Sequence, residues 1–164
     1  MNMEKKFELT DNFIINAFGV KLFQIKCTKS FKYAKEGDLG GYVEKDENLD
    51  QESDAWVSGN AEVSGDARVS GDAWVSGNAR VYGYAEIDNN NKHCGFDCFG
   101  SANRHTHAYL TKENKVEITC GCFRGSIEEF EKRVEETHSG TIYEKQYKAI
   151  IDVIKIKFGL TDLI

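Results

Sequence analysis

The residues that could bind a metal ion or catalyse a reaction gather in the second half of the chain. All four histidines and four of the five cysteines lie within 46 residues: His93, Cys94, Cys98, His105, His107, Cys120, Cys122 and His138. Thiolates and imidazoles are the side chains that Zn²⁺ prefers. The spacings C-x3-C, H-x-H and C-x-C are, however, looser than the paired C-x2-C motifs of zinc sites. Structural zinc stays open as an alternative that the spacing does not favour, and we expect no cofactor.

Seven residues of this half are candidates for one ligand-binding pocket. Ser126 stands at a predicted helix N-terminus, whose backbone N–H groups can bind an anion, and Arg104 or Arg124 could hold a phosphate through two hydrogen bonds. The competing interpretation of Arg104 is a surface ion pair, and that of His138 is a place in the core. The predicted pocket comprises Arg104, His107, Cys120, Cys122, Arg124, Ser126 and His138. The predicted ligand is a phosphate-bearing small molecule.

Catalysis is the alternative use of the same residues. A thiolate at Cys120 or Cys122 could be activated by His138 and act as a nucleophile. The sequence identifies no third group that would orient the histidine. We therefore expect no catalytic residues and no enzyme activity.

The segment that carries these residues, 91–164, reads as an α+β domain. Alternating apolar residues over 106–111 and 115–120 predict a β-hairpin with its turn at 112–114. A helix is expected to begin at Ser126, where Glu129 completes a capping box, and to end at Gly140. A second helix is expected over 142–158. The predicted apolar stripes are Ile127, Phe130 and Val134 on the first helix, and Tyr147, Ile150, Ile151, Ile154 and Phe158 on the second.

A six-residue repeat over 55–87 organises the chain before this domain. Alanine and valine recur in the pattern A-x-V, with glycine at each turn. The residues at x match best at a spacing of eighteen, which predicts three repeats per coil. The predicted pairs are Trp56 over Trp74, Glu62 over Arg80, and Arg68 over Glu86. The repeat resembles the left-handed parallel β-helix of hexapeptide-repeat proteins, and the handedness is taken from that resemblance.

The expected fold class is therefore mainly β plus α+β, in three domains. Residues 1–42 are predicted to form an N-terminal β cap, residues 43–90 the hexapeptide-repeat β-helix, and residues 91–164 the α+β domain. Trp56, Trp74 and Tyr82 are predicted interface residues, and we expect a homo-oligomer. For the two tryptophans, the alternatives to an oligomer contact are a stack between adjacent rungs of the coil and a platform on which a base stacks.

Two enzyme classes with hexapeptide repeats are not supported. Hexapeptide acyltransferases use a histidine base, and gamma-class carbonic anhydrases bind zinc through histidines of their coils. The sequence has no histidine between Gly37 and Lys92, and no long loop interrupts the repeats.

Composition and charge exclude some classes of binding partner. The 164 residues include no proline and carry a formal charge of −6, with a pI near 5.3, which argues against a general nucleic-acid binder. Three basic and thirteen acidic groups give residues 36–90 a charge of −10. No apolar run is long enough to span a membrane, and no signal peptide is apparent. We therefore expect a cytosolic protein without membrane contact.

Three segments together resemble hypothetical proteins from phages and prophages of Firmicutes and their relatives. These are the entry segment from Leu22 through GDLGGYVE (37–44), the GDA/GNA-x-V-S repeats, and CGCFRGSIEEF (120–130) followed by ETH (136–138). The resemblance covers nearly the whole chain and implies a small accessory phage protein in the host cytosol.

Combined with the candidate pocket, the resemblance predicts a phage-encoded binding protein that antagonises a host defence system. It would sequester a nucleotide-type small molecule or occlude a defence protein. Two alternatives stay open: an enzyme that uses the Cys/His residues, and an acidic structural or DNA-mimicking protein, for which the charge of residues 36–90 is the motive.

Overall fold

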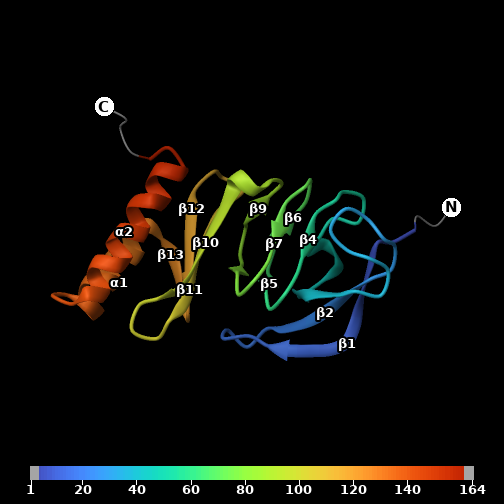
Figure 1. Cartoon of the computed structure of the whole chain (residues 1–164), viewed down its shortest axis with the longest axis horizontal. Coiled ribbons are helices and arrows are strands. Elements are labelled where there is room, and N and C mark those ends of the chain that lie inside the picture. Colours follow the sequence, from blue (N-terminus) through green and yellow to red (C-terminus); the bar gives the residue numbers. More distant parts are fainter. Residues whose placement is uncertain (1–3, 161–164) are drawn as a thin grey trace.

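The computed structural model describes residues 4–160 and shows an elongated chain (Figure 1). The N-terminal hairpin lies at one end, the hexapeptide repeats follow, and a four-stranded sheet carries two helices at the other end. No helix of the described part is long and apolar enough to cross a membrane.

An antiparallel hairpin opens the chain. It consists of β1 (Phe7–Ile15) and β2 (Lys21–Cys27), and β3 (Leu39–Val43) pairs with β2 in the same sense. The hairpin runs beneath the repeats (Figure 1), and at its tip the ring of Phe18 packs edge-on against Tyr82, 5.1 Å away. This contact brings the tip toward the C-terminal sheet.

The hexapeptide repeats form six strands of two residues each. Their alanines and valines are buried, and the glycine of each turn has a positive φ near 65°. Each of the first three strands pairs in parallel with the strand eighteen residues on, and Trp56–Trp74, Glu62–Arg80 and Arg68–Glu86 are all paired residues. The strands are β4 (Trp56–Val57), β5 (Glu62–Val63), β6 (Arg68–Val69), β7 (Trp74–Val75), β8 (Arg80–Val81) and β9 (Glu86–Ile87).

The fold class predicted from the sequence is wrong. The described residues form a mixed α+β protein with four separate sheets and two helices, not a mainly β protein built on a left-handed β-helix. The short strands are divided among three sheets because they pair with one another only at a spacing of eighteen residues. The physical reason for the difference is the N-terminal hairpin, which joins the largest of these sheets, in the order β1-β2-β3-β5-β8, and makes it half antiparallel.

The C-terminal third contains the predicted hairpin and both predicted helices. Its sheet has the order β10-β11-β12-β13 and is antiparallel throughout. The strands are β10 (His93–Phe99), β11 (Arg104–Leu110), β12 (Val116–Cys120) and β13 (Phe123–Ser126). Two short 3-10 helices flank the repeats instead: Asp46–Asn48 before them and Asn90–Lys92 after them. Strands β10 and β13 were not predicted.

The helices α1 (Ile127–His138) and α2 (Ile142–Lys157) cover this sheet (Figure 1). Both bonds of the predicted capping box at Ser126 and Glu129 are present. The buried faces are Ile127, Phe130 and Val134 on α1, and Tyr147, Ile150, Ile151 and Ile154 on α2, as predicted. Phe158, which was predicted to continue the second stripe, lies just after α2 and is only partly buried.

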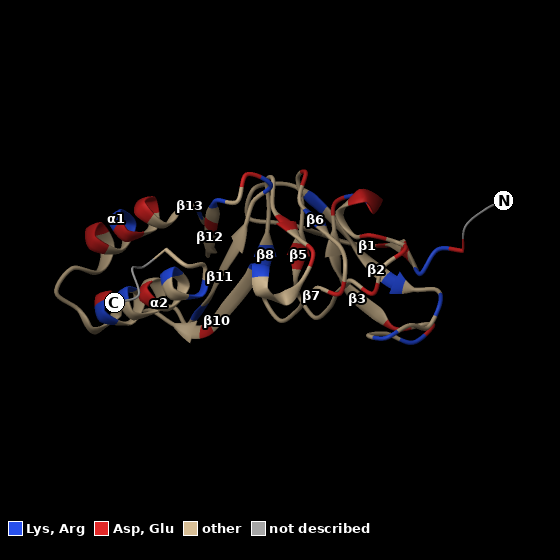
Figure 2. Cartoon of the chain, turned by 90° about the horizontal axis from the view of Figure 1, so that it is seen from above, with Lys and Arg blue, Asp and Glu red and all other residues tan. Residues whose placement is uncertain are grey.

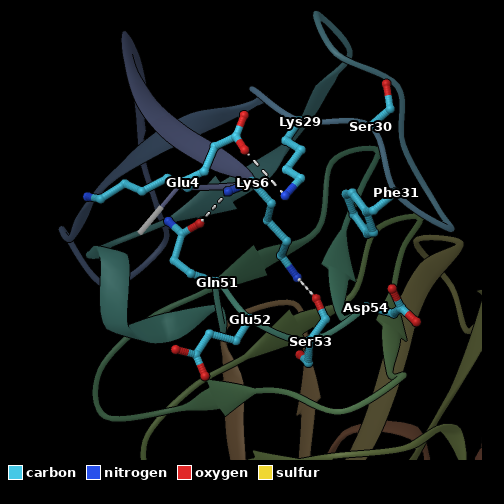
Figure 3. A pocket seen from close by; sticks show the side chains of 10 residues that line it. Glu4, Lys6, Lys29, Ser30, Phe31, Gln51, Glu52, Ser53 and Asp54 are labelled. Atoms are coloured by element: carbon cyan, nitrogen blue, oxygen red, sulfur yellow. Dashed lines mark hydrogen bonds and ion pairs between the residues drawn. The ribbon is translucent and has the colours of Figure 1, made fainter. Parts of the chain in front are cut away.

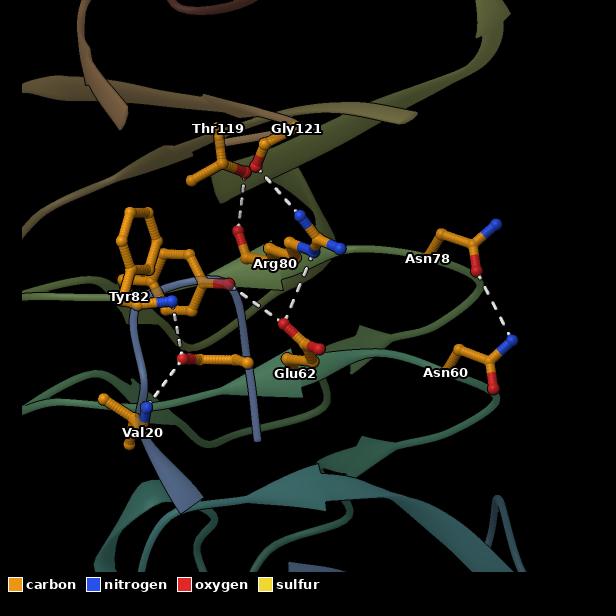
Figure 4. A network of polar contacts seen from close by, with 10 residues as sticks. Val20, Asn60, Glu62, Asn78, Arg80, Tyr82, Thr119 and Gly121 are labelled. Carbon is orange, nitrogen blue, oxygen red and sulfur yellow. Dashed lines mark hydrogen bonds and ion pairs between the residues drawn. The ribbon is translucent and has the colours of Figure 1, made fainter. Parts of the chain in front are cut away.

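Polar contacts join the repeats to the C-terminal sheet (Figure 4). The Arg80 guanidinium donates to the carbonyl of Gly121 at 2.8 Å, and the Thr119 hydroxyl donates to the carbonyl of Arg80 at 2.8 Å. The buried hydroxyl of Tyr109, on β11, accepts from the N–H of Tyr82 at 3.3 Å. These contacts fix the two parts side by side and shape the candidate site at their junction.

Candidate functional site

Two neighbouring cavities lie at the C-terminal sheet: one between the sheet and its helices, and one where the sheet meets the hairpin tip and the repeats. The first, the Cys120 cavity, has a volume of about 140 Å³ and lies between the sheet and the helices. The second, the Arg80 cavity, measures about 420 Å³. Arg104 and Cys122 line both, so the cavities adjoin, and we call the pair the junction cavities.

The Cys120 cavity brings together four of the seven residues predicted for the ligand pocket. These are Arg104, Cys120, Cys122 and His138. They come from the start of β11, the end of β12, the following turn and the last residue of α1. The rest of the lining is Phe123, Phe130, Arg133, Val134, Thr137 and Tyr147.

Aromatic rings make up much of this cavity. His138 stacks on Tyr147 with ring centroids 5.5 Å apart, and Phe130 meets Tyr147 edge-on at 5.5 Å. The Cys120 thiol accepts from the Thr106 hydroxyl at 3.3 Å and lies 3.8 Å from the Tyr147 oxygen. Burial, and then the neighbouring Cys120, raise the pKa of Tyr147, so its phenol is neutral at physiological pH.

The Arg80 cavity is lined by residues of all three parts. Ala17 comes from the hairpin tip, Asn78 and Arg80 from the repeats, and Arg104, His105, Gly121 and Cys122 from the C-terminal sheet and its turn. The Arg104 side chain lies close to Gly121, since a Cβ added to that glycine would overlap the guanidinium.

The linings of the junction cavities carry strong positive charge. Arg80, Arg104 and Arg133 contribute guanidinium groups, and no Asp or Glu is among the described lining residues. Arg80 is partly neutralised by Glu62, with 3.4 Å between its Nε and the carboxylate, as the adjacent blue and red segments of β8 and β5 show in Figure 2. Within residues 4–160, neither Arg104 nor Arg133 forms an ion pair, and Arg133 lies over the Phe123 ring.

A chain of three histidines leads from the Arg80 cavity into the protein. His105 Nδ1 lies 2.6 Å from the Asp97 carboxylate, and His105 Nε2 lies 2.9 Å from His107 Nδ1. His107 Nε2 is in turn 2.9 Å from His93 Nδ1. Burial, and then Lys157, lower the pKa of His93 to about 4, and burial lowers the pKa of His107 well below its ordinary value.

The other three predicted ligand residues lie outside the junction cavities. His107 is buried in the histidine chain, and Arg124 pairs with Glu117 on the neighbouring strand. Ser126 caps α1, but the Glu129 carboxylate already accepts from its backbone N–H at 3.2 Å. The N-terminus of α1 therefore holds a carboxylate of its own chain where the sequence suggested a phosphate.

The predicted interface residues are not a common surface. Trp56 and Tyr82 are each only 2% exposed and pack within the chain, so they are unavailable to a partner. Trp74 is 44% exposed, stacks on Tyr33 and donates from its indole to the Ser58 hydroxyl at 2.7 Å. Among the described residues, no cluster of three or more His, Cys, Asp or Glu side chains is arranged to hold a metal ion.

A larger cavity, about 860 Å³, lies at the opposite end of the repeats (Figure 3). Lys6 is buried there, and its ammonium donates to the carbonyls of Ser53 and Ala55, both at 2.5 Å. Burial lowers the pKa of Lys6 to about 8. Since these carbonyls belong to the first turns of the repeats, Lys6 satisfies backbone acceptors at the end of the stack. That structural role accounts for the buried amine.

Sequence reasoning missed Arg80, His105 and Tyr147 as site residues. Arg80 was assigned to a pair with Glu62, which is present, and Tyr147 to the apolar stripe of α2, where it is buried. His105 follows Arg104 directly, and its position in an H-x-H pattern was the available signal. No protein family model matches the chain, and no curated protein matches its sequence.

Proposed function

We propose that the chain is a binding protein for a phosphate-bearing small molecule, which occupies the junction cavities. The observation that carries this proposal is their lining of three arginines without a carboxylate among the described lining residues. Guanidinium groups present planar pairs of N–H donors that match phosphate oxygens. Arg104 and Arg133 have no acidic partner within residues 4–160, so their charge is available to a ligand.

The shape of the cavities favours a ligand with a flat ring and a phosphate. Phe123, Phe130 and Tyr147 give the Cys120 cavity aromatic walls, and its small volume suits one ring system. The Arg80 cavity falls within the range of roughly 300–1,000 Å³ that is usual for ligand sites. A nucleotide with its base in the Cys120 cavity and its phosphate between Arg80 and Arg104 meets both conditions.

Binding is favoured over nucleophilic catalysis by the surroundings of the thiols. Within the described part of the chain, no hydrogen bond joins His138 to a cysteine. The hydrogen-bond partners of the Cys120 sulfur are the hydroxyls of Thr106 and of a neutral Tyr147, and neither is a base that would generate a thiolate.

The biological setting of the proposal is the one that the sequence resemblance implies. A phage protein that sequesters a nucleotide-type molecule would deprive a host defence system of its signal. Occlusion of a defence protein is the alternative, and the charged, concave lining supports the small molecule instead. A homo-oligomer in the host cytosol stays a prediction.

Isothermal titration calorimetry with adenosine 5′-monophosphate and with inorganic phosphate tests the proposal. Loss of a hydrogen-bonded charge typically costs 1.5–3 kcal/mol, so we expect Arg104→Gln to weaken binding by about tenfold or more. Arg124→Gln is the matched control, since Arg124 lies outside the cavities, and it should keep the affinity. Absence of binding to the unaltered protein, or loss of affinity only in Arg124→Gln, would overturn the proposal.

A further inference from the structure

The histidine chain has two fixed ends that both accept hydrogen bonds. At one end is the carboxylate of Asp97. At the other end, His93 Nε2 lies 3.2 Å from Asn90 Oδ1. The orientation of the Asn90 amide is set by Trp74, whose backbone N–H donates to the same oxygen at 2.9 Å. A flipped amide would bring its NH₂ group against that N–H, so Asn90 presents oxygen to His93.

Counting protons along the chain gives a definite result. Asp97 and Asn90 each need a donor N–H from a histidine, and each of the two His–His contacts at 2.9 Å needs one proton between its nitrogens. The four contacts therefore require four ring protons. Three neutral imidazoles supply three. Without the fourth, two unprotonated nitrogens, or a nitrogen and an oxygen, would face each other at hydrogen-bond distance.

The position of the extra proton follows from the surroundings of each ring. His107 is enclosed by the other two rings, and His93 is faced by Lys157 from α2, so positive charge is unfavourable on both. His105 is faced by Asp97 from β10, which favours an imidazolium. Arg80 from β8 and Arg104 line the Arg80 cavity beside His105, and their positive charges disfavour an imidazolium there. An anionic ligand in the cavity would favour the imidazolium.

We propose that the three-histidine chain stores one extra proton and presents it to the ligand as the His105 imidazolium, so that binding of a dianionic phosphate at the Arg80 cavity is coupled to proton retention. This rests on the proposed function. His93, remote from the cavity lining, acts as a positioning residue: it fixes the direction of the hydrogen bonds and thereby the charge on His105.

The sign of the coupling is definite. A dianion binds more tightly to the protonated chain, so affinity is high at low pH and falls as pH rises through the range in which the chain loses its proton. With one proton per ligand, the fall approaches tenfold per pH unit. Sulfate is the appropriate probe for this measurement, because its charge stays constant across neutral pH and phosphate's does not.

Two substitutions at the remote end shift the proton balance in opposite directions. In His93→Phe, His107 Nε2 has no partner. The two contacts that remain, His105 with His107 and His105 with Asp97, need only two protons, which neutral His105 and neutral His107 supply. The extra proton is no longer required, and the fall in sulfate affinity should move to lower pH. In Asn90→Asp, a carboxylate replaces the amide oxygen, and the fall should move to higher pH. Asn90 is exposed, so this variant is usable even where His93→Phe fails to fold.

The experiment has a ligand-free arm and a binding arm. ¹⁵N NMR of the histidine rings at pH 7, without ligand, should show both nitrogens of His105 protonated and one proton each on His93 and His107. A neutral His105 would overturn the inference and leave the proposed function intact, provided that phosphate still binds. Sulfate affinity that is independent of pH, or unmoved by both substitutions, would also overturn it. If neither phosphate nor sulfate binds the unaltered protein, the proposed function fails first, whatever the NMR spectrum shows.

Discussion

Two buried histidines make stability depend on pH on the acid side. In the folded chain the pKa of His93 is about 4 and that of His107 is also depressed, whereas an unfolded histidine has its ordinary value of 6.5. Below pH 6.5 the unfolded state therefore binds more protons than the folded state. The stability present above pH 6.5 is lost as pH falls towards 4.

Urea unfolding across this range checks the prediction. We expect the free energy of unfolding to decrease between pH 6.5 and 4, by on the order of 1–3 kcal/mol for His93, and His107 should lower it further. His93→Phe removes one of the two groups, so its loss of stability over the same interval should be smaller. An unfolding free energy that is flat from pH 6.5 to 4 would contradict the buried, neutral state of these rings.

The site residues could be predicted only where the type of the side chain was sufficient evidence. Arg104, Cys120, Cys122 and His138 were proposed from residue type and do line one cavity. Arg124 and Ser126 could equally bind an anion by residue type. However, Arg124 forms an ion pair with Glu117, and the backbone N–H of Ser126 donates to Glu129. Their partners are set by strand register and by the cap of α1, and residue type alone carries no information about which charge is already satisfied.

At the scale of elements, Gly121 in the turn between β12 and β13 sets the position of Arg104. Its φ of +59° favours glycine, and a Cβ there would overlap the Arg104 guanidinium. In Gly121→Ala, backbone strain should cost about 1–2 kcal/mol, and displacement of Arg104 should weaken phosphate binding by about tenfold.

Gly140→Ala is the matched control for this substitution. Gly140 also has a positive φ, +77°, but nothing lies within 4 Å of the added Cβ. It should show a similar loss of stability in thermal unfolding and an unchanged affinity in calorimetry. Equal affinities in the two variants would show that Arg104 is not held by the turn.

Elements with local signals were predictable, and elements that depend on distant partners were not. The capping box at Ser126 and the glycine at 140 bounded α1 within about two residues. Strand β10 was missed because its sequence, HCGFDCF, shows no clear alternation and includes a bulge where Cys98 has a positive φ. The six-residue period correctly gave the eighteen-residue register. The period held no information on the N-terminal hairpin, which belongs to the same sheet as β5 and β8. For this reason the predicted fold class was wrong.

At the scale of the whole molecule, Arg80 links the repeats to the C-terminal sheet. It pairs with Glu62, only 7% exposed, and donates to the Gly121 carbonyl (Figure 4). Arg80→Met would leave the Glu62 carboxylate buried without its counter-charge, although the Tyr82 hydroxyl still donates to it at 2.9 Å. Removing one partner of a fully buried pair typically costs about 3–5 kcal/mol, and the Arg80 side chain is itself 36% exposed, so the loss should lie at or below the lower end of that range.

We expect that loss in urea unfolding of Arg80→Met. The double variant Glu62→Leu/Arg80→Met removes both charges and should recover most of the stability. It should not recover phosphate binding, because the cavity still lacks Arg80. A double variant as unstable as the single one would indicate that the bond to Gly121 is the stabilising contact.

The most direct test of the central claim is an NMR titration of the labelled protein with adenosine 5′-monophosphate. The account predicts that the resonances that shift belong to the junction cavities: the side chains of Arg80, Arg104 and His105, and the backbone of Gly121 and Cys122. Shifts that centre on Arg124 and Ser126 at the start of α1, or no shifts at millimolar ligand, would contradict it.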